Sequence, residues 1–296
     1  MKGRNTDMRE RIDGASFAQA IIHAAASINL QKQQINELNV FPVPDGDTGT
    51  NMGLTISTAA AELKKKQPRT VGEAAATNAS ALLRGARGNS GVILSLLFRG
   101  FSKAVKDKDE IDGRDLAIAL DFGVAAAYKA VMKPAEGTIL TVSRVAGTVA
   151  ALEAQSNRNM EHVLTCTIAA AKDALAETLH QNPVLEKAGV VDAGGMGFVV
   201  ILEGMLSSLQ GDDIVAPTES VPDMGQEQAN FSDFSMRISP LATAPSLSFP
   251  GKMTRTRRHC GNSCPRWATV WCWWMMMRSS KSTSTPTIPA PPLKRL

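Results

Sequence analysis

Cysteine and long apolar runs are scarce in most of this 296-residue chain. Cys166 is the only cysteine in the first 233 residues, which excludes a disulfide within that part and suits the reducing cytoplasm. No run of 18 apolar residues occurs, so we expect no membrane span. The N-terminal residues 1–7 are polar and no apolar stretch follows them, so we expect no signal peptide and a cytoplasmic location.

Acidic residues are missing after Asp233. Up to that position 22 Lys and Arg stand against 28 Asp and Glu, whereas the remainder carries ten basic residues and no acid. All four Trp, three of the four Cys and eight of the fifteen Pro also lie beyond Asp233. The chain therefore has two parts of different character. We expect a globular domain over residues 10–211, a linker over 212–238 and an aberrant, disordered tail over 239–296.

Apolar residues in the first part recur at the spacing of α-helices. Phe17, Ile21, Ala24 and Ile28 form one face of a helix that runs from about residue 15 to 37. The same spacing recurs in three later sets: Ile93, Leu96, Leu97 and Gly100; Val142, Val145, Val149 and Leu152; and Phe198, Ile201, Leu202 and Met205. Further helices are expected over four stretches, three of them rich in alanine: 52–66, 71–84, 112–131 and 158–178. The sequence thus predicts an all-α fold, an eight-helix antiparallel bundle.

The first loop, NVFPVPDGDTGTNM over residues 39–52, places two carboxylates two residues apart between Pro and Gly. In a turn, Asp45 and Asp47 can converge on one hard cation, and Mg²⁺ prefers carboxylate, water and phosphate oxygens. Thr48–Asn51 then open the next helix, where unpaired N–H groups suit an anion. A polar turn with an Asp cap is the alternative for an isolated Asp-Gly-Asp. The spacing excludes an EF-hand calcium loop.

Three more glycine-rich segments precede helices. They are Gly85–Gly91, Lys133–Thr138 and Gly189–Gly197. Each can place backbone N–H groups near a phosphate, and each is also typical of a capped turn. In an up-and-down bundle alternate helix starts share one end, so four such starts beside paired carboxylates favour a site for a Mg²⁺–nucleotide complex.

These segments together resemble the dihydroxyacetone kinase L-subunit (DhaL-like) family. NVFPVPDGDTGTNM is similar to its signature, in the branch that forms the ATP-binding subunit of bacterial fatty acid kinase. GARGNSGVILS from Gly85, KPAEGTILTV from Lys133 and GVVDAGGMGF from Gly189 match the same branch in the same order. The resemblance covers about residues 10–235 and is specific, because four motifs recur in sequence order.

The resemblance implies an eight-helix barrel that holds ATP and two Mg²⁺ ions at one end. Asp45 and Asp47 match metal ligands, and Asn39 takes the place of a third Asp found in the dihydroxyacetone kinase branch. The positions that match phosphate-binding residues are Thr48, Gly49, Thr50, Asn51, Asn89 and Ser90. A further segment, near the nucleoside, corresponds to Asp192, Ala193 and Gly194.

The family binds its phosphoryl acceptor on a separate partner protein, which for this branch is similar to a fatty-acid-binding subunit. The resemblance therefore implies a kinase component that supplies Mg²⁺–ATP to a bound fatty acid. A dihydroxyacetone kinase L-subunit, with a dihydroxyacetone-binding partner, is the first alternative. A non-catalytic nucleotide-binding protein is the second, because the downstream domain is lost. We expect no nucleic acid partner and leave a homodimer open.

The tail reads as a shifted reading frame. Trp and Met have one codon each, so Trp273–Met277 is encoded by TGG TGG ATG ATG ATG, which from the third base reads Val-Asp-Asp-Asp. A frameshift between about Asp233 and Pro240 accounts for the missing acids and for the Trp cluster together. The alternative is a natural basic tail that binds nucleic acid or membrane, but such tails rarely carry Trp clusters.

We predict that sequencing the gene across codons 233–240 will reveal an insertion or deletion relative to an open frame that encodes acidic residues downstream. Restoring that frame should remove all of the clustered Trp codons from translation. A continuous, unshifted frame in independent reads of the locus would contradict the frameshift and favour the natural basic tail.

Overall fold

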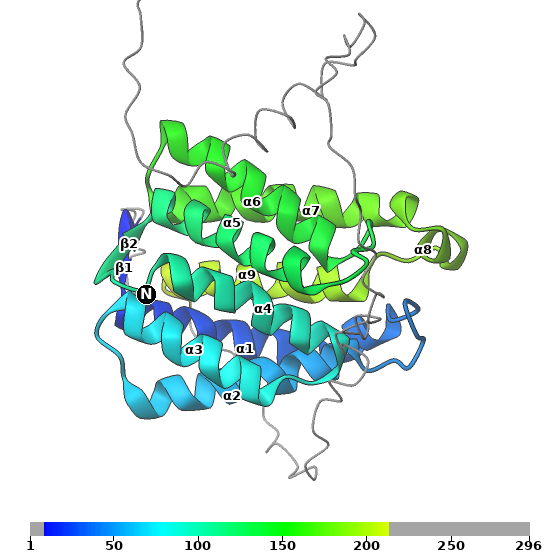
Figure 1. Cartoon of the computed structure of the whole chain (residues 1–296), viewed down its shortest axis with the longest axis horizontal. Helices are drawn as coiled ribbons and strands as arrows, with labels where there is room; N and C mark the ends of the chain where they lie inside the picture. Colours follow the sequence, from blue (N-terminus) through cyan, green and yellow to red (C-terminus); the bar gives the residue numbers. More distant parts are fainter. Residues whose placement is uncertain (1–8, 213–296) are drawn as a thin grey trace, which may run out of the picture. The chain divides into compact units, whose positions relative to one another are not determined.

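A computed structural model describes residues 9–212 of the chain, and the expected linker beyond Asp212 and the expected tail lie outside these residues. In the described part, nine helices and two short strands follow one another along the chain (Figure 1). In order they are β1 (Arg11–Asp13), α1 (Gly14–Glu37), α2 (Thr48–Lys66), α3 (Val71–Gly85), α4 (Gly88–Ala104), β2 (Glu110–Asp112), α5 (Gly113–Ala130), α6 (Ile139–Ser156), α7 (Met160–Gln181), α8 (Pro183–Ala188) and α9 (Ala193–Gln210).

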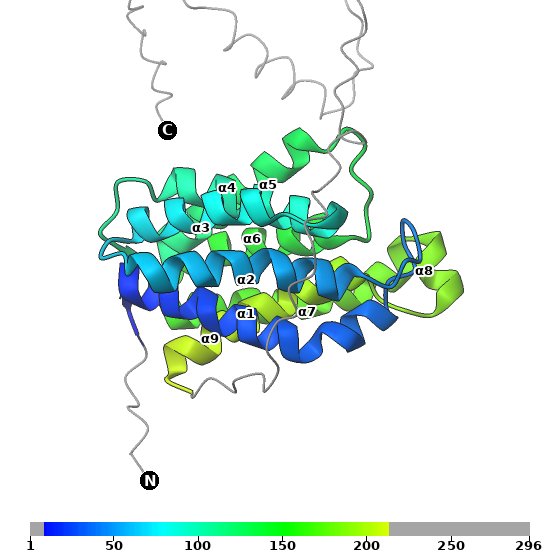
Figure 2. The same cartoon turned by 90° about the horizontal axis from the view of Figure 1, so that it is seen from below.

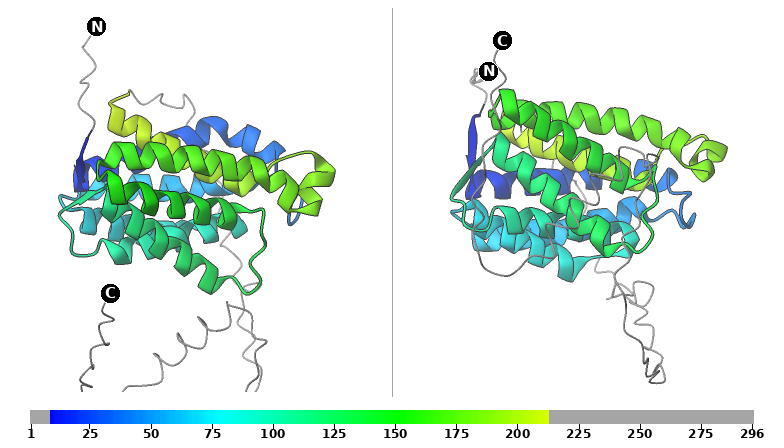
Figure 3. Two further views of the ribbon diagram at one scale, coloured as in Figure 1. Left: turned by 90° about the horizontal axis from the view of Figure 1, so that it is seen from above. Right: turned by 45° about the horizontal axis from the view of Figure 1, so that its top comes forward.

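The eight long helices form a closed ring of antiparallel neighbours. Each helix from α1 to α7 packs on the next one in sequence, α7 packs on α9, and α9 returns to pack extensively on α1. The helices are roughly parallel rods when viewed from below (Figure 2) and from above (Figure 3). The prediction of an all-α antiparallel bundle of eight helices is therefore confirmed, and the ring makes it a barrel.

The predicted apolar faces supply most of the core. Phe17, Ile21, Ala24 and Ile28 of α1 are completely buried. The predicted face of α9 is buried along its whole length: Phe198, Ile201, Leu202 and Met205. Burial of this much aliphatic surface, at roughly 25 cal/mol per Å², is the main stabilising contribution to the fold.

The predicted face of α6 is partly wrong. Val142 is buried, but Leu152 is 59% exposed. The buried face of α6 instead runs through small residues such as Ala146 and Ala150. Small side chains let α6 approach its neighbours closely. The larger Leu152, on the adjacent face of α6, therefore points to solvent.

Three elements have no counterpart in the predicted set of helices. The six-residue helix α8 begins with a proline and ends at Gly189, which has a positive φ of 69°. The strands β1 and β2 pair antiparallel through Ile12 and Ile111 and join the N-terminal segment to the α4–α5 connection. Elements this short leave little periodic signal in a sequence.

Helix α9 is apolar on most of its faces. It contacts α1, α7, α6 and α2. Among the described helices it alone is long and apolar enough to cross a membrane, and 67% of it is buried inside the bundle. Its place in the core accounts for that composition, since a helix buried on all sides is apolar on all sides.

Close backbone contact between α4 and α5 gives a test of the packing. A Cβ atom on Gly100 would lie 2.2 Å from the Phe122 carbonyl oxygen, whereas one on Gly147 in α6 would meet nothing closer than 3.8 Å. We predict that Gly100→Ala lowers the free energy of unfolding by about 1–3 kcal/mol through overpacking. Gly147→Ala should leave it unchanged or raise it by about 0.5–1 kcal/mol.

Denaturant unfolding of both variants beside the parent chain measures the difference. Gly147→Ala serves as the control for the general effect of adding a methyl group inside a helix. Equal effects of the two substitutions would contradict the close α4–α5 contact.

Candidate functional site

Alternating helix direction brings four helix starts to one end of the barrel. α2, α4, α6 and α9 all begin at the end opposite the β1–β2 pair, where Figure 1 shows the loops and α8 gathered. The glycine-rich segments singled out in the sequence precede these four helices. We call this the loop end of the barrel.

The loop between α1 and α2 brings the three predicted metal ligands into one cluster. Asn39 is buried, and its side-chain amide donates a hydrogen bond to Asp45 Oδ1. Asp47 follows two residues later, at the N-cap position of α2. Burial raises the pKa of Asp47 and the Asp45 carboxylate raises it further, against a hydrogen bond with Asn51 that lowers it. Negative charge is thus concentrated here, and a cation would offset it.

Helix α1 fixes the first turn of α2. The Asn36 side chain accepts a hydrogen bond from the Thr50 backbone N–H at 3.1 Å and donates to Thr50 Oγ1 at 2.9 Å. Gly49 packs so closely on α1 that a Cβ would lie 2.2 Å from the Lys32 carbonyl oxygen. Thr48 is buried, whereas Thr50 is exposed at the surface of the loop end.

The second loop lies directly against the first turns of α2. Thr55 Oγ1 accepts a hydrogen bond from the Arg87 backbone N–H at 3.1 Å and donates to the Asn51 carbonyl at 2.6 Å. Gly88 has a positive φ of 55°, and a Cβ there would lie 2.4 Å from the Asn51 amide nitrogen, so this position requires glycine. Asn89 is exposed and Ser90 half-buried at the start of α4.

Side-chain capping separates the helix starts into two kinds. The N-cap residues Asp47 of α2 and Arg87 of α4 make no side-chain capping hydrogen bond, whereas the N-cap side chain of each other described helix does. Those caps include Thr138 of α6 and Asp192 of α9, at the same end of the barrel. At α2 the Asn36 side chain of α1 takes one N–H group, that of Thr50. Since an uncapped N-terminus presents backbone N–H groups to its surroundings, α2 and α4 are the two starts suited to an anion.

The third predicted loop is more enclosed than the first two. Asp192 is buried, its Oδ2 accepts a hydrogen bond from the Gly195 N–H at 2.7 Å, and its own N–H donates to Thr178 Oγ1 at 3.1 Å. Burial raises the pKa of Asp192 to about 6, although hydrogen bonds from the N–H groups of Gly195 and Ile139 oppose the shift. The carboxylate therefore joins the starts of α9 and α6. Ala193 and Gly194 are buried beside it.

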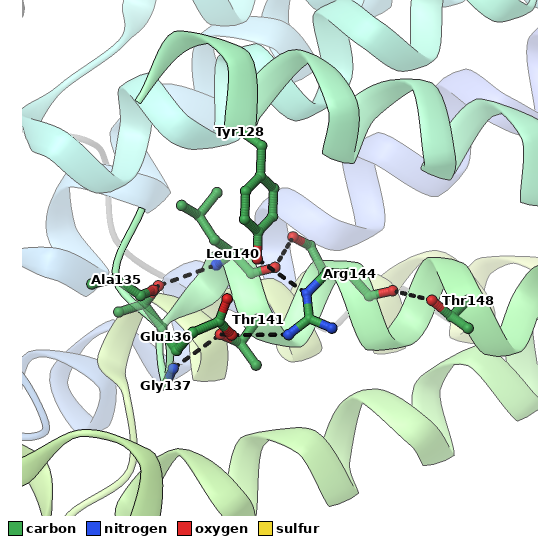
Figure 4. A network of polar contacts seen from close by, with 10 residues as sticks. Tyr128, Ala135, Glu136, Gly137, Leu140, Thr141, Arg144 and Thr148 are labelled. Atoms are coloured by element: carbon green, nitrogen blue, oxygen red, sulfur yellow. Dashed lines mark hydrogen bonds and ion pairs between the residues drawn. The ribbon is translucent and has the colours of Figure 1, made fainter. Parts of the chain in front are cut away.

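A polar network holds the segment before α6 (Figure 4). The Glu136 carboxylate accepts hydrogen bonds from Thr141 Oγ1 at 2.7 Å and from Arg144 Nη2 at 2.9 Å, and Arg144 Nε donates to the Tyr128 hydroxyl at 3.2 Å. These hydrogen bonds lower the pKa of Glu136, with Thr141 the largest cause. Lys133 in the same segment is exposed.

The structure thus brings Asn39, Asp45 and Asp47 together, and places the starts of α2 and α4 side by side. Asp192 and its neighbours lie at the same end, inside the barrel wall. Sequence reasoning missed Asn36 and Thr55, which position the first and second loops. Both lie inside helices and outside the glycine-rich loops, so only their contacts across helices reveal the role.

An all-α barrel with these loops at one end defines a DhaL-like domain, a class that belongs to kinase systems. The chain belongs to the DAK2 domain family, whose model matches residues 42–207, more than half of the chain.

Two bacterial relatives and one solved structure illustrate the similarity. Protein YloV of Bacillus subtilis (strain 168) is 43% identical over 227 residues, which are 76% of this chain and 41% of that protein. The uncharacterized protein SH1689 of Staphylococcus haemolyticus is 45% identical over 214 residues, 72% of this chain and 39% of that protein. This chain therefore spans about two fifths of the length of these relatives. The dihydroxyacetone kinase of C. freundii in complex with AMP-PNP and Mg²⁺ shares the fold, with a TM-score of 0.51 and 20% identity over 70% of this chain and 36% of that one.

The buried Asp192 gives a prediction for pH. Its pKa of about 6 lies above the ordinary value near 4, so between these values the folded state binds more protons than the unfolded state. The contribution of Asp192 to the free energy of unfolding should therefore fall by about 2–3 kcal/mol as the pH rises from about 4 to about 6. In Asp192→Asn this contribution should be missing.

Denaturant unfolding at a series of pH values measures the difference between parent and variant. The exposed Asp121→Asn, on α5, serves as the control and should keep the slope of the parent. If Asp192→Asn keeps the same slope too, the carboxylate is not the group that titrates.

Proposed function

We propose that this chain is the nucleotide-binding component of a phosphoryl-transfer enzyme, with Mg²⁺–ATP as donor and a fatty acid on a partner protein as acceptor. The observation that carries the proposal is the pairing of two helix starts whose N-cap residues make no side-chain capping bond, α2 and α4, with the Asn39–Asp45–Asp47 cluster. Phosphates need both donors and cations, and this end of the barrel offers sites for both.

The cluster fits a hard cation by its chemistry. Two carboxylates and one amide are oxygen donors of the kind that Mg²⁺ takes, with water and phosphate oxygens completing the shell. When bound, Mg²⁺ neutralises charge that develops on the transferred phosphoryl group. Asn39 donates a hydrogen bond to Asp45 Oδ1 and so holds this carboxylate in position, and its own side-chain oxygen is a further candidate ligand.

The helix starts are suited to hold the phosphates. The starts of α2 and α4 lie at the same end of the barrel, and Thr50 and Asn89 are exposed there. Ser90 adds a hydroxyl group in the first turn of α4. Rigid donors of this kind keep a phosphoryl group in line for transfer without reorganisation.

Asp192 and its hydrogen bonds stabilise the helix starts that border the proposed site. The buried carboxylate caps α9 and reaches the first residue of α6, so it holds two helix starts in fixed positions. The family resemblance supports a position near the nucleoside for Asp192, Ala193 and Gly194. We assign Asp192 the role of shaping this part of the site.

The chain needs no nucleophile of its own, because a fatty-acid carboxylate is already ionised at neutral pH. The acceptor oxygen would be a carboxylate oxygen of the fatty acid bound on the partner protein, and the products would be an acyl phosphate and ADP. DhaL-like domains work with a substrate-binding subunit, which supports a partner of this kind. The C. freundii dihydroxyacetone kinase structure contains AMP-PNP and Mg²⁺, which supports the nucleotide and the metal for the shared fold.

Calorimetric titration of the full chain with ATP, with and without Mg²⁺, tests the donor site. We predict Mg²⁺-dependent binding that weakens at least about tenfold, or about 1.4 kcal/mol, in Asp45→Ala/Asp47→Ala. A double variant with the same spacing, Asp107→Ala/Asp109→Ala, lies in the exposed α4–β2 connection at the other end and should bind as the parent does.

Two results would contradict the proposal. One is a folded chain that binds no nucleotide in the presence of Mg²⁺. The other is equal weakening in both double variants, which would mean that general charge, and not the loop between α1 and α2, governs binding.

A further inference from the structure

A second cluster of metal-binding side chains lies away from the loop end. Glu153 near the end of α6 and His162 and Cys166 near the start of α7 bring a carboxylate oxygen, an imidazole nitrogen and a thiol sulfur within 4.8 Å of one another. Within residues 9–212 this is the single group of three or more such ligands that meets this criterion. Neither the family motifs nor the proposed nucleotide site uses any of the three.

The helices hold the three side chains on facing surfaces. His162 and Cys166 are four residues apart, so they lie one turn apart on the same face of α7. Glu153 comes from α6, which runs antiparallel to α7 and is joined to it by only three residues. The loop itself is fixed, because the Gly113 N–H donates to the Arg158 carbonyl at 2.8 Å.

Two of the three distances between the ligand atoms already match those between the ligands of a tetrahedral metal ion. His162 Nε2 lies 3.4 Å from Glu153 Oε2 and 3.7 Å from Cys166 Sγ. Zn²⁺ bonds of about 2.0–2.3 Å to O, N and S imply ligand atoms roughly 3.3–3.8 Å apart in a tetrahedron. Only the distance between Glu153 and Cys166 would need to adjust, and the glutamate side chain is 38% exposed and free to turn.

The donor set is selective for a borderline-soft ion. Thiolate and imidazole favour Zn²⁺ over Mg²⁺ or Ca²⁺, which prefer oxygen ligands alone. Burial and the Glu153 charge raise the pKa of the Cys166 thiol, so without metal it keeps its proton. On binding, the thiol proton passes to solvent and the thiolate sulfur bonds the metal, with no change in oxidation state.

We propose that Glu153, His162 and Cys166 form a zinc site that joins α6 to α7 at the end of the barrel opposite the nucleotide loops. Water takes the fourth position, since the His162 side chain is 34% exposed. The neighbouring Glu161 already accepts hydrogen bonds from the Arg9 N–H at 3.1 Å and from Gln210 Nε2 at 3.2 Å. The metal would therefore tighten the corner where α6, α7, α9 and the N-terminal segment meet.

The test uses an untagged full chain in which the tail cysteines are replaced, Cys260→Ser, Cys264→Ser and Cys272→Ser, so that Cys166 is the only thiol. Excess Mg²⁺ is present to occupy oxygen-only sites. Titration with Co²⁺ should produce a thiolate-to-cobalt charge-transfer band and the visible bands of tetrahedral cobalt at one ion per chain. Zn²⁺ should displace the Co²⁺ and raise the unfolding temperature.

Four variants in this single-cysteine chain separate the ligands from their surroundings. Cys166→Ser should abolish the charge-transfer band. His162→Gln and Glu153→Gln should each weaken Zn²⁺ by more than the about 10–100-fold typical of outer-shell residues. His180→Gln, an exposed histidine on the same helix, should bind Zn²⁺ as the parent does.

A measurement on the single-cysteine parent keeps the proposal testable if a variant fails to fold. Zn²⁺ should slow alkylation of Cys166, and a chelator should restore the rate. The absence of both the charge-transfer band and this protection would overturn the proposal. So would a band that neither His162→Gln nor Glu153→Gln changes, because the thiol would then bind metal without the other two residues.

Discussion

The packing of α9 on α1 closes the ring, and the place of every loop depends on it. This contact is tight: a Cβ on Gly204 of α9 would lie 2.7 Å from the Ala24 Cα atom. Small residues thus let the last long helix return to the first. Because consecutive helices alternate in direction, a closed ring of eight puts the starts of α2, α4, α6 and α9 at one end. Topology therefore brings together segments separated by more than 140 residues, and contacts such as that of Asp192 with the start of α6 then hold them.

The four helix starts differ in how their N–H groups are capped. Thr138 and Asp192 cap α6 and α9 with their own side chains, which fixes the loops and uses N–H groups that a ligand would need. The N-cap residues of α2 and α4 make no such bond, and at α2 the Asn36 side chain of α1 takes only the Thr50 N–H. An anion at these two starts would replace the missing caps, so ligand binding and helix stability are coupled there. Asp45 and Asp47 lie in the loop directly before α2, so a cation bound to them could also bind a phosphate held at the start of that helix.

Much of this arrangement could be predicted from the sequence. The apolar period of 3.6 residues located the long helices, and the loop motifs identified the residues that gather at one end. Periodicity failed on α6, where Leu152 continues the apolar pattern but is exposed, because burial there follows the small residues that permit close packing. Glycine-rich starts also looked alike, since the sequence does not show which of them a side chain caps. The roles of Asn36 and Thr55 arise from contacts between helices, which no local pattern encodes.

The two ends of the barrel differ in how their local structure contributes to stability. At the loop end, Asp45 and Asp47 lie close enough for one charge to disfavour the other, so the ligand-free protein loses stability there. Such a site persists only when the surrounding structure compensates. At the other end, the β1–β2 pair, the three-residue α6–α7 connection and the hydrogen bonds of Glu161 fix the helices. A metal held by Glu153, His162 and Cys166 would add to this anchoring without touching the nucleotide loops. Ligand binding at the loop end would thus offset a local loss of stability, whereas a metal at the opposite end would add to a corner that is already anchored.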